Sequence, residues 1–575
     1  MRPLMERALQ VLLGSRGTPL VLAPTGYGKT RASPEIAEAA IREGVARGLV
    51  HVVPLRSLVR RIYLEAFAGY PGSGYQMSSP LGDEGKSPYF MRRLVVSTVD
   101  SYLWNLFRVP VLEYYNMARR VTSGHYYPVA ASLLSSVNVF DEAHVYLGEG
   151  STLTGAAAVL AATQYLAYTE TPTLVETATM PPSLIGGLAR ALRRAGNRGK
   201  ELVLVAWECL ARALSERYGL RVRAETVREE PGESVRWETS IVSQGWSSEV
   251  LQEIAGLSRE GPVLAVANTV ERAVRLYDEL SKLADTEVVL VHGRLAEKDR
   301  RAAEERAALV GERGEGIIVA TQVVEVGVDV NSIAVYTDAA PAENLVQRAG
   351  RACRRGASLD WCRENRGRVT VILDPDTAPG NHVYSRESVE SVLVAISKIT
   401  AQSREGLDWR VPCPGQRVRS YYDLIACTEP QLQGILRLAS SLREYLKSDG
   451  RPLALLEHLD RLGACHLYRE STMIPIITKR GPVLASLDWA LSGPGRSYLD
   501  TCDSAPCLVA LHEGKRCGEA PAQRLLEAVA AGRCSMIARA LLEDLASASQ
   551  KCLEEPVSYA LRARSGAYRR GVGLV

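Results

Sequence analysis

The sequence contains a glycine-rich segment whose residue types suit the binding of a phosphate chain. Residues 23–30 read Ala-Pro-Thr-Gly-Tyr-Gly-Lys-Thr and follow an apolar run at 19–22. Glycines let backbone amides turn toward phosphate oxygens, and a helix that begins here offers its positive end to the same anion. We therefore predict a phosphate loop for ATP and Mg²⁺, in which Lys29 reaches the β- and γ-phosphates and Thr30 holds the metal. The other predicted loop residues are Thr25, Gly26, Gly28 and Ala23, which stands where such loops prefer glycine.

A pair of carboxylates follows a second apolar run. Asp141-Glu142-Ala143-His144 comes directly after residues 137–140. Because the carboxyl ends of parallel strands share one edge of a sheet, we expect these side chains beside the phosphate loop. Asp141 is predicted to bind Mg²⁺ and Glu142 to polarise the attacking water, while His144 senses the γ-phosphate or links to the next motif. Taken alone, such an acidic turn is often only the cap of a helix.

Arginines near residue 350 could supply the positive charge that phosphoryl transfer requires. The segment 347–354 reads Gln-Arg-Ala-Gly-Arg-Ala-Cys-Arg. Arg351 and Arg354 are three residues apart, so one helical turn would let both face the γ-phosphate. Arg355 falls off that face and is predicted to form a salt bridge. We count Gln347 with the catalytic residues; a solvated basic helix face is the alternative.

Two series of short apolar strands alternate with helical stretches and must position these groups. Near-continuous apolar runs are typical of parallel sheets covered on both faces. We therefore predict an α/β fold with two tandem parallel-sheet domains and a mainly helical C-terminal domain, with bounds 1–210, 211–400 and 401–575. The charged segment 221–243 is interpreted as the crossing between the sheets. The predicted strands are 19–23, 49–53, 94–97, 136–140 and 173–177, then 263–267, 287–291, 316–320, 333–337 and 368–373.

The C-terminal part lacks this alternation of short apolar strands with helical stretches. Residues 429–458 and 523–555 have helical patterns, and 475–491 and 507–517 are candidate strands. Its basic end at 562–570 is either a contact for nucleic acid or a solvated terminus.

Further motifs make the chain resemble a superfamily 2 helicase of the DEAH-box type, with two RecA-like domains. They are Pro54-Leu55-Arg56, residues 97–100 (Ser-Thr-Val-Asp), Thr177-Ala178-Thr179, residues 320–329 and the arginine segment. The resemblance implies that Thr177, Thr179 and His144 couple ATP hydrolysis to movement and that Asp329 meets the ribose. A motor that ignores sequence should contact phosphates of the strand. The candidates are Arg56, Thr98, Thr321 and Gln322, with Asn268 and residues 292–294 as weaker ones.

The amino-acid sequences of residues 320–329, 177–181 and 267–270 are similar to those of the helicase subunit of type I CRISPR interference. This resemblance implies 3′ to 5′ movement on single-stranded DNA and a partnership with a crRNA-guided surveillance complex. Many members carry a fused His-Asp nuclease, but this sequence has no His-Asp dipeptide and its motifs begin near Met1. We therefore expect the split form, with the nuclease as a separate subunit. A repair or RNA helicase, or an ATP-binding bridging subunit without processive unwinding, remains an alternative.

Composition sets outer bounds. The chain has 575 residues, 46% of them hydrophobic, and a net charge of +4, so a nucleic-acid site must be a local patch. We expect no membrane association and a cytoplasmic location, because no apolar run reaches about 20 residues and no signal peptide is recognised.

The 11 cysteines are not expected to form a secreted-type framework of disulfides. A zinc knuckle, a disulfide and free thiols stay open for Cys502, Cys507, His512 and Cys517. Met5 lies where related helicases read adenine with glutamine, so base specificity is also open.

Overall fold

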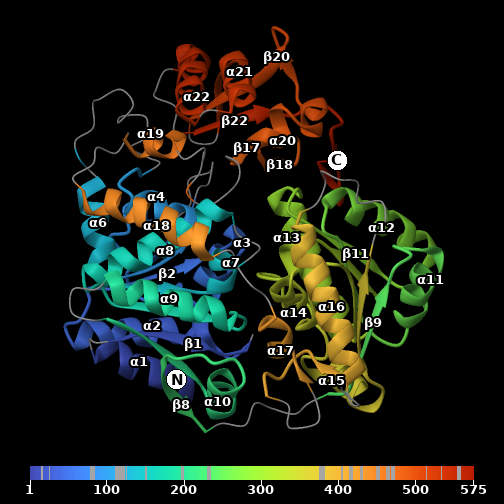
Figure 1. Ribbon diagram of the computed structural model, residues 1–575. Coiled ribbons are helices and arrows are strands. Elements are labelled where there is room, and N and C mark those ends of the chain that lie inside the picture. The colour runs from blue at the N-terminus through green and yellow to red at the C-terminus, as the bar shows by residue number, and fades with distance from the viewer. Residues whose placement is uncertain are drawn as a thin grey trace.

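The computed structural model describes residues 1–14, 17–24, 26–77, 85–110, 124, 126–148, 152–195, 200–228, 235–373, 383–402, 406–413, 419–427, 432–448, 454–461, 467, 473–512, 515–532, 534–552 and 558–574. Two α/β domains lie side by side in Figure 1, and the C-terminal part lies across one end of both. Among the described residues, no helix combines the length and the apolar character needed to cross a lipid bilayer.

The first domain is built on an eight-stranded parallel sheet with the order β3-β4-β2-β5-β6-β1-β7-β8. Helices cover both faces, which explains why its central strands are apolar along their whole length. The strands are β1 (Gly17–Leu22), β2 (Leu49–Val53), β3 (Ser73–Gln76), β4 (Leu94–Thr98), β5 (Val137–Phe140), β6 (Thr173–Thr177), β7 (Glu201–Trp207) and β8 (Arg223–Val227). The helices are α1 (Pro3–Leu13), α2 (Lys29–Arg42), α3 (Arg56–Ile62), the π-helix η1 (Tyr63–Phe67), α4 (Val99–Leu106), α6 (Tyr126–Leu134), α7 (Ala143–Leu147), α8 (Leu153–Tyr168), α9 (Pro182–Ala195) and α10 (Glu208–Glu216).

The second domain repeats this design with a six-stranded parallel sheet, in the order β11-β12-β10-β13-β14-β9. Its strands are β9 (Trp237–Val242), β10 (Val263–Val266), β11 (Val288–Val291), β12 (Ile317–Ala320), β13 (Ala334–Asp338) and β14 (Gly367–Ile372). Its helices are α11 (Ser248–Leu257), α12 (Val270–Leu283), α13 (Glu297–Arg313), the 3₁₀ turn η3 (Gln322–Val324), α14 (Ala342–Ala349), α15 (Gly356–Glu364) and α16 (Arg386–Gln402). The predicted strands of both domains are confirmed to within two residues.

The boundary between the first two domains lies later than residue 210. The segment 221–243 is the crossing, as predicted, but its two strands belong to different sheets. β8 ends the first sheet and β9 is an edge strand of the second. Both are partly exposed along much of their length, which made their assignment from the sequence ambiguous.

The C-terminal part does not form one unit from residue 401, because two of its sections pack on the α/β domains and the last section has a sheet of its own. β15 (Leu407–Asp408), β16 (Arg419–Ser420) and α17 (Tyr421–Ile425) pack beside the second sheet, whereas α18 (Leu432–Lys447) packs on α8 of the first domain. The last section contains helices and also a mixed sheet, β18-β17-β22-β20-β19 with β21 paired to β20. It therefore holds more strand than a mainly helical domain. Its elements are α19 (Ala454–Arg461), β17 (Met473–Thr478), β18 (Gly481–Ser486), α20 (Leu487–Leu491), η4 (Pro494–Tyr498), β19 (Thr501–Cys502), β20 (Ala505–His512), β21 (Lys515–Pro521), α21 (Gln523–Ala531), α22 (Cys534–Ala548), η5 (Ser549–Lys551) and β22 (Ser558–Arg562).

The end of the chain returns to the second domain. It forms a small hairpin of β23 (Tyr568–Arg569) and β24 (Gly573–Leu574). His292 shares a hydrogen bond of 2.6 Å between Nε2 and the Val572 carbonyl, and Arg569 pairs with Asp278 at 2.7 Å. The contacts of Tyr568 and Arg569 are thus with protein, and His292 is fully buried, so it is a poor candidate for contacting a strand.

Four disulfides join described cysteines, which differs from the expected absence of a disulfide framework. The bonds are Cys209–Cys413, Cys353–Cys362, Cys502–Cys507 and Cys517–Cys552. The first connects α10 of the first domain to the segment after β15. That segment is anchored on the second domain, where Trp409 Nε1 donates to Thr239 Oγ1 at 3.0 Å. The two α/β domains are therefore joined by a bond between residues 204 positions apart, in addition to the crossing at 221–243.

Candidate nucleotide site

The predicted phosphate loop lies between β1 and α2. Gly26 and Gly28 have positive φ values of 82° and 90°, a conformation that glycine adopts without strain. This geometry turns the chain into the start of α2. Lys29 is buried, and its Nζ donates to the carbonyl oxygens of Ala23 at 3.0 Å and Pro24 at 3.3 Å. Thr25 lies outside the described residues.

The strand order brings the acidic motif beside this loop. β6 separates β5 from β1, so the ends of β5 and β6 adjoin the phosphate loop. Thr30 Oγ1 donates to Asp141 Oδ2 at 3.1 Å, and the Glu142 amide donates to Asp141 Oδ1 at 2.9 Å. Burial favours a higher pKa for Asp141, but the hydrogen bond and proximity of His51, the charge of Lys29 and the Thr30 hydroxyl lower it overall. Burial raises the pKa of Glu142.

These oxygens suit the magnesium ion that the sequence predicts. Mg²⁺ prefers oxygen ligands and is commonly held by one or two protein groups together with nucleotide phosphates. The Thr30 hydroxyl and the Asp141 carboxylate are adjacent, and both residues line the same cavity. The donor set therefore fits Mg²⁺, which Thr30 and Asp141 would hold.

A cavity of about 750 Å³ joins this region to the second domain. Lys29 and Glu142 line one wall, while Asp329, Arg351 and Arg354 line the other. Burial and the neighbouring Arg354 lower the pKa of Arg351 to about 9, so it stays charged at neutral pH. The groups predicted to hold phosphates and those predicted to neutralise them thus face one space. Gln347 is buried but is not part of the described cavity wall.

The arginines reach the cavity by a different route from the one predicted. α14 ends at Ala349, so Arg351 and Arg354 do not share a helical turn. The chain leaves the helix at Gly350, and Cys353 has a φ of 54°. Arg354 and Arg355 both pair with Asp329, at 2.7 and 2.6 Å, so the salt bridge predicted for Arg355 is confirmed.

Two further arginines on α3 span the boundary between the domains. Arg60 forms an ion pair with Glu297 at the start of α13, and Arg61 donates to the Gly327 carbonyl. Arg61 also lines the nucleotide cavity. Neither contact could be predicted from the sequence, because each joins residues more than 200 positions apart.

His144 and Thr177 meet as the coupling hypothesis requires. His144 Nδ1 and Thr177 Oγ1 share a hydrogen bond of 2.9 Å, and Thr177 Oγ1 also accepts from the Thr179 amide at 3.1 Å. This chain of contacts joins the acidic turn to the segment after β6. Burial, together with Lys29, lowers the pKa of His144 to about 3, so its imidazole is neutral near pH 7.

The low pKa of His144 predicts acid sensitivity. Between the ordinary histidine pKa of 6.5 and the pKa of about 3 in the folded protein, the unfolded chain binds a proton here that the folded chain does not. Stability should therefore fall as pH falls through this window, by up to about 1.4 kcal/mol per pH unit from this residue. In urea unfolding at pH 4.5 and 7, a His144→Asn variant should lose less stability on acidification than the parent. Equal losses would contradict this assignment.

The predicted strand contacts also have structural roles within the protein. Thr98 Oγ1 caps α4 by accepting from the Ser101 amide at 3.3 Å. Asn268 Oδ1 accepts from Arg348 at 2.9 Å, and the Asn268 carbonyl accepts from Gln322 Nε2 at 2.7 Å. Thr98 and Thr321 are buried, and Arg56 and Gln322 are partly exposed. Their contact with nucleic acid stays a prediction.

Three buried polar residues near the acidic motif were missed from the sequence. Ser33 and His51 form a hydrogen-bonded chain with Asp141. Glu176 precedes Thr177 on β6 and is fully buried, and neither carboxyl oxygen has a hydrogen-bond partner among the described residues. Burial, with Asp141 nearby, raises the pKa of Glu176 well above its ordinary value. A polar residue inside an otherwise apolar strand was the signal available for His51 and Glu176.

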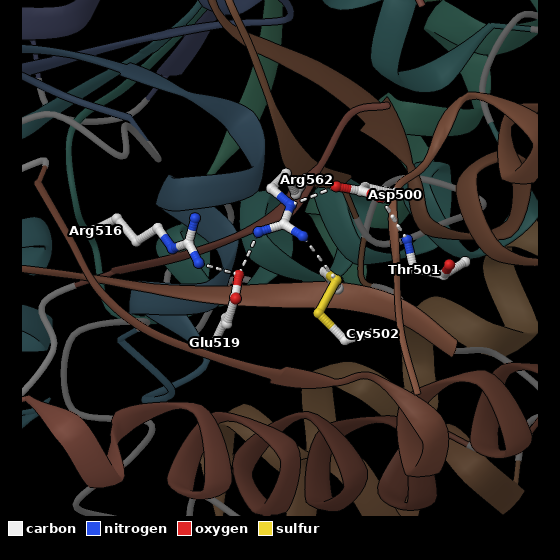
Figure 2. The surroundings of a disulfide bond; sticks show 7 residues. Asp500, Thr501, Cys502, Arg516, Glu519 and Arg562 are labelled. Atoms are coloured by element: carbon white, nitrogen blue, oxygen red, sulfur yellow. Dashed lines mark hydrogen bonds and ion pairs between the residues drawn. A yellow bond between two sulfur atoms is a disulfide. The ribbon is translucent and has the colours of Figure 1, made fainter. Parts of the chain in front are cut away.

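The cysteines of the C-terminal section are oxidised rather than arranged around zinc. Figure 2 shows the Cys502–Cys507 bond beside Arg562, whose Nη2 donates to Cys507 Sγ at 3.4 Å. Cys517 is bonded to Cys552. Three of the four candidate zinc ligands are therefore in disulfides, which rules out the zinc knuckle in this state. The candidate strands over 507–517 are confirmed, and they form the antiparallel pair β20 and β21.

Two parallel-sheet domains, a phosphate loop and arginines facing it across a shared cavity are the arrangement of superfamily 2 helicases with RecA-like domains. Comparison with known proteins narrows this class. Residues 259–357 match the protein family described as CRISPR-associated nuclease/helicase Cas3, C-terminal. The predicted resemblance to the CRISPR-associated superfamily 2 helicases is therefore confirmed.

Individual relatives agree with this result. The chain is 27% identical over 372 residues to the CRISPR-associated helicase Cas3 of Thermoproteus tenax, covering 61% of this chain and 56% of that protein. It is 31% identical over 194 residues to the CRISPR-associated nuclease/helicase Cas3 of Haloferax volcanii, covering 30% and 20%. The crystal structure of T. fusca Cas3-ADP is similar in fold, with a TM-score of 0.57 at 17% identity, covering 83% and 59%. The chain thus matches about half the length of the first relative and a fifth of the second.

Proposed function

We propose that this chain is the ATP-dependent helicase of a type I CRISPR interference system, moving 3′ to 5′ on single-stranded DNA in the cytoplasm. It would act with a crRNA-guided surveillance complex and unwind target DNA for a separate nuclease subunit. One observation carries the proposal. Lys29 and Glu142 of the first domain share a cavity with Arg351 and Arg354 of the second.

This arrangement supports a hydrolysis mechanism in which the two domains act together. Lys29 would bind the β- and γ-phosphates, and Glu142, with its raised pKa, would orient the attacking water and accept its proton. Arg351 and Arg354 would neutralise the charge that develops on the γ-phosphate. Mg²⁺, held by Thr30 and Asp141, would supply further charge neutralisation when bound. Because these groups lie on different domains, binding and release of ATP would close and open the cavity.

Coupling to DNA would follow the chain from Glu142 to the end of β6. His144 is neutral and hydrogen-bonded to Thr177, so a shift of the acidic turn would be passed to Thr179. Strand contacts on both domains would then move relative to each other in each cycle. The similarity to a CRISPR-associated helicase and a CRISPR-associated nuclease/helicase supports a role in unwinding.

The proposal predicts that DNA stimulates ATP hydrolysis. The purified chain should be assayed without nucleic acid, with single-stranded DNA and with single-stranded RNA, beside a Glu142→Gln variant. Stimulation by DNA that is lost in the variant is expected, because the variant cannot take the proton from the attacking water. Stimulation by RNA alone would favour an RNA helicase, and indifference to both would favour a bridging subunit. Unwinding of duplexes with a 3′ or a 5′ tail tests the polarity.

A further inference from the structure

A buried hydrogen-bonded chain lies behind the acidic motif. Ser33 of α2 contacts His51 of β2, with 2.9 Å between Oγ and Nδ1. His51 in turn contacts Asp141, with 3.3 Å between Nε2 and Oδ2. Ser33 and His51 have no exposed surface, and Asp141 is only 5% exposed. Solvent therefore does not compete for these bonds.

The chemistry of the partners defines the direction of the bond to Asp141. An ionised carboxylate can only accept, so the hydrogen of His51 must lie on Nε2 and point at Asp141. Nδ1 and the Ser33 hydroxyl share the remaining bond, because the hydroxyl can either donate to the ring or accept from it. The ring is further held edge-on against Phe67, with 5.8 Å between ring centroids. Its orientation is therefore defined on both sides.

The Asp141 carboxylate is held at both oxygens. Oδ1 accepts from the Glu142 amide at 2.9 Å, and Oδ2 accepts from Thr30 and His51. Of these donors, only Thr30 and Glu142 belong to the predicted nucleotide motifs. His51 approaches from inside the sheet, where Val50 and Val52 beside it on β2 are buried apolar residues. Burying an imidazole in such a strand is unfavourable unless both of its nitrogens are paired.

We propose that His51 is a positioning residue that fixes the Asp141 carboxylate for binding of a divalent cation together with ATP. The inference rests on the proposed function, because it assigns a task to Asp141 in nucleotide binding. Groups that hydrogen-bond to metal ligands in this way commonly change metal affinity by about 10–100-fold when they are replaced. Ser33 supports the same arrangement from one step further away.

Nucleotide binding tests this role without measuring turnover. The affinity of each variant for a fluorescent, non-hydrolysable ATP analogue is measured in EDTA and then in MgCl₂. His51→Phe keeps an aromatic ring but loses both hydrogen bonds. We expect it to match the parent in EDTA and to show an Mg²⁺-dependent gain in affinity that is about 10–100-fold smaller. His51→Gln, whose amide nitrogen can reach the position of Nε2, should restore much of that gain, and Ser33→Ala should have an intermediate effect.

A matched control removes a comparable buried bond elsewhere in the same sheet. Tyr102 donates to Asn138 Oδ1 at 2.8 Å, and neither residue lines the nucleotide cavity. Tyr102→Phe should leave both affinities unchanged. An equal Mg²⁺-dependent gain in His51→Phe and parent, or an equal loss in EDTA and MgCl₂, would overturn the positioning role. A parent chain that binds no nucleotide would instead refute the proposed function as well, so the two failures are distinguishable.

Discussion

Replacing Arg351 with alanine should lower kcat for ATP hydrolysis by about 10³–10⁵, the range for an arginine that neutralises a transferring phosphoryl group. Arg351 lies across the cavity from Lys29 and Glu142, is only 8% exposed and remains charged at neutral pH. Its charge acts in a space with little solvent, where electrostatic stabilisation is strongest. KM should change far less than kcat, because the developing charge exists mainly in the transition state.

Arg355 provides the matched control for this variant. It is four residues away and pairs with Asp329, but its side chain is mostly exposed and it does not line the cavity. An exposed ion pair contributes only about 0–1 kcal/mol. Arg355→Ala should therefore hydrolyse ATP at nearly the parental rate. Similar losses in both variants would show that the basic segment acts through folding, and thermal denaturation of each variant would reveal this.

Removing the Cys209–Cys413 disulfide should cause the largest loss of stability of any single cysteine-pair substitution in the described structure. The bond closes a loop with a sequence separation of 204, for which the chain-entropy relation gives about 5 kcal/mol. The measurement compares urea unfolding of the parent, purified without reductant, with a Cys209→Ser, Cys413→Ser double variant. A reductant should lower the free energy of unfolding of the parent by more than that of the variant, because only the parent has this bond to lose.

The Cys353–Cys362 pair is the matched comparison. Its loop has a sequence separation of only 9 and lies within the second domain, so the same relation gives about 3 kcal/mol. A double serine variant of this pair should therefore unfold at a higher urea concentration than the variant of the longer loop. The opposite ranking would mean that the long bond does not restrict the unfolded chain as its loop length implies.

Much of the fold could be predicted because the relevant signals are local. Buried parallel strands such as 49–53 and 263–267 are apolar throughout, and each ends at a motif of recognisable chemistry. The phosphate loop and the acidic turn are contiguous segments whose residue types and spacing indicate nucleotide binding. Their proximity then followed from the rule that the carboxyl ends of parallel strands share an edge.

The remaining features depend on contacts between distant segments. Gly350 directly after α14 is a signal for the end of a helix, but the pairing of Ala352 with Ser332 beyond it joins distant segments and has no local signal. Cys209 and Cys413 carry no shared local pattern. β8 and β9 resemble each other in composition, yet sheet pairing assigns them to different domains. Such outcomes are set by tertiary packing and not by local propensity.

The boundary between the two α/β domains is held by different chemistry at its two ends, since α3 and α10 lie far apart along it in Figure 1. At α3, the Arg60–Glu297 pair is about 40% exposed on both sides, so salt screens it and its contribution is about 0–1 kcal/mol. At α10, a covalent bond holds the domains at any ionic strength. High salt should therefore weaken the contact at α3, and thiols should break the bond at α10. Ionic strength and redox conditions should thus change the separation of the two domains independently.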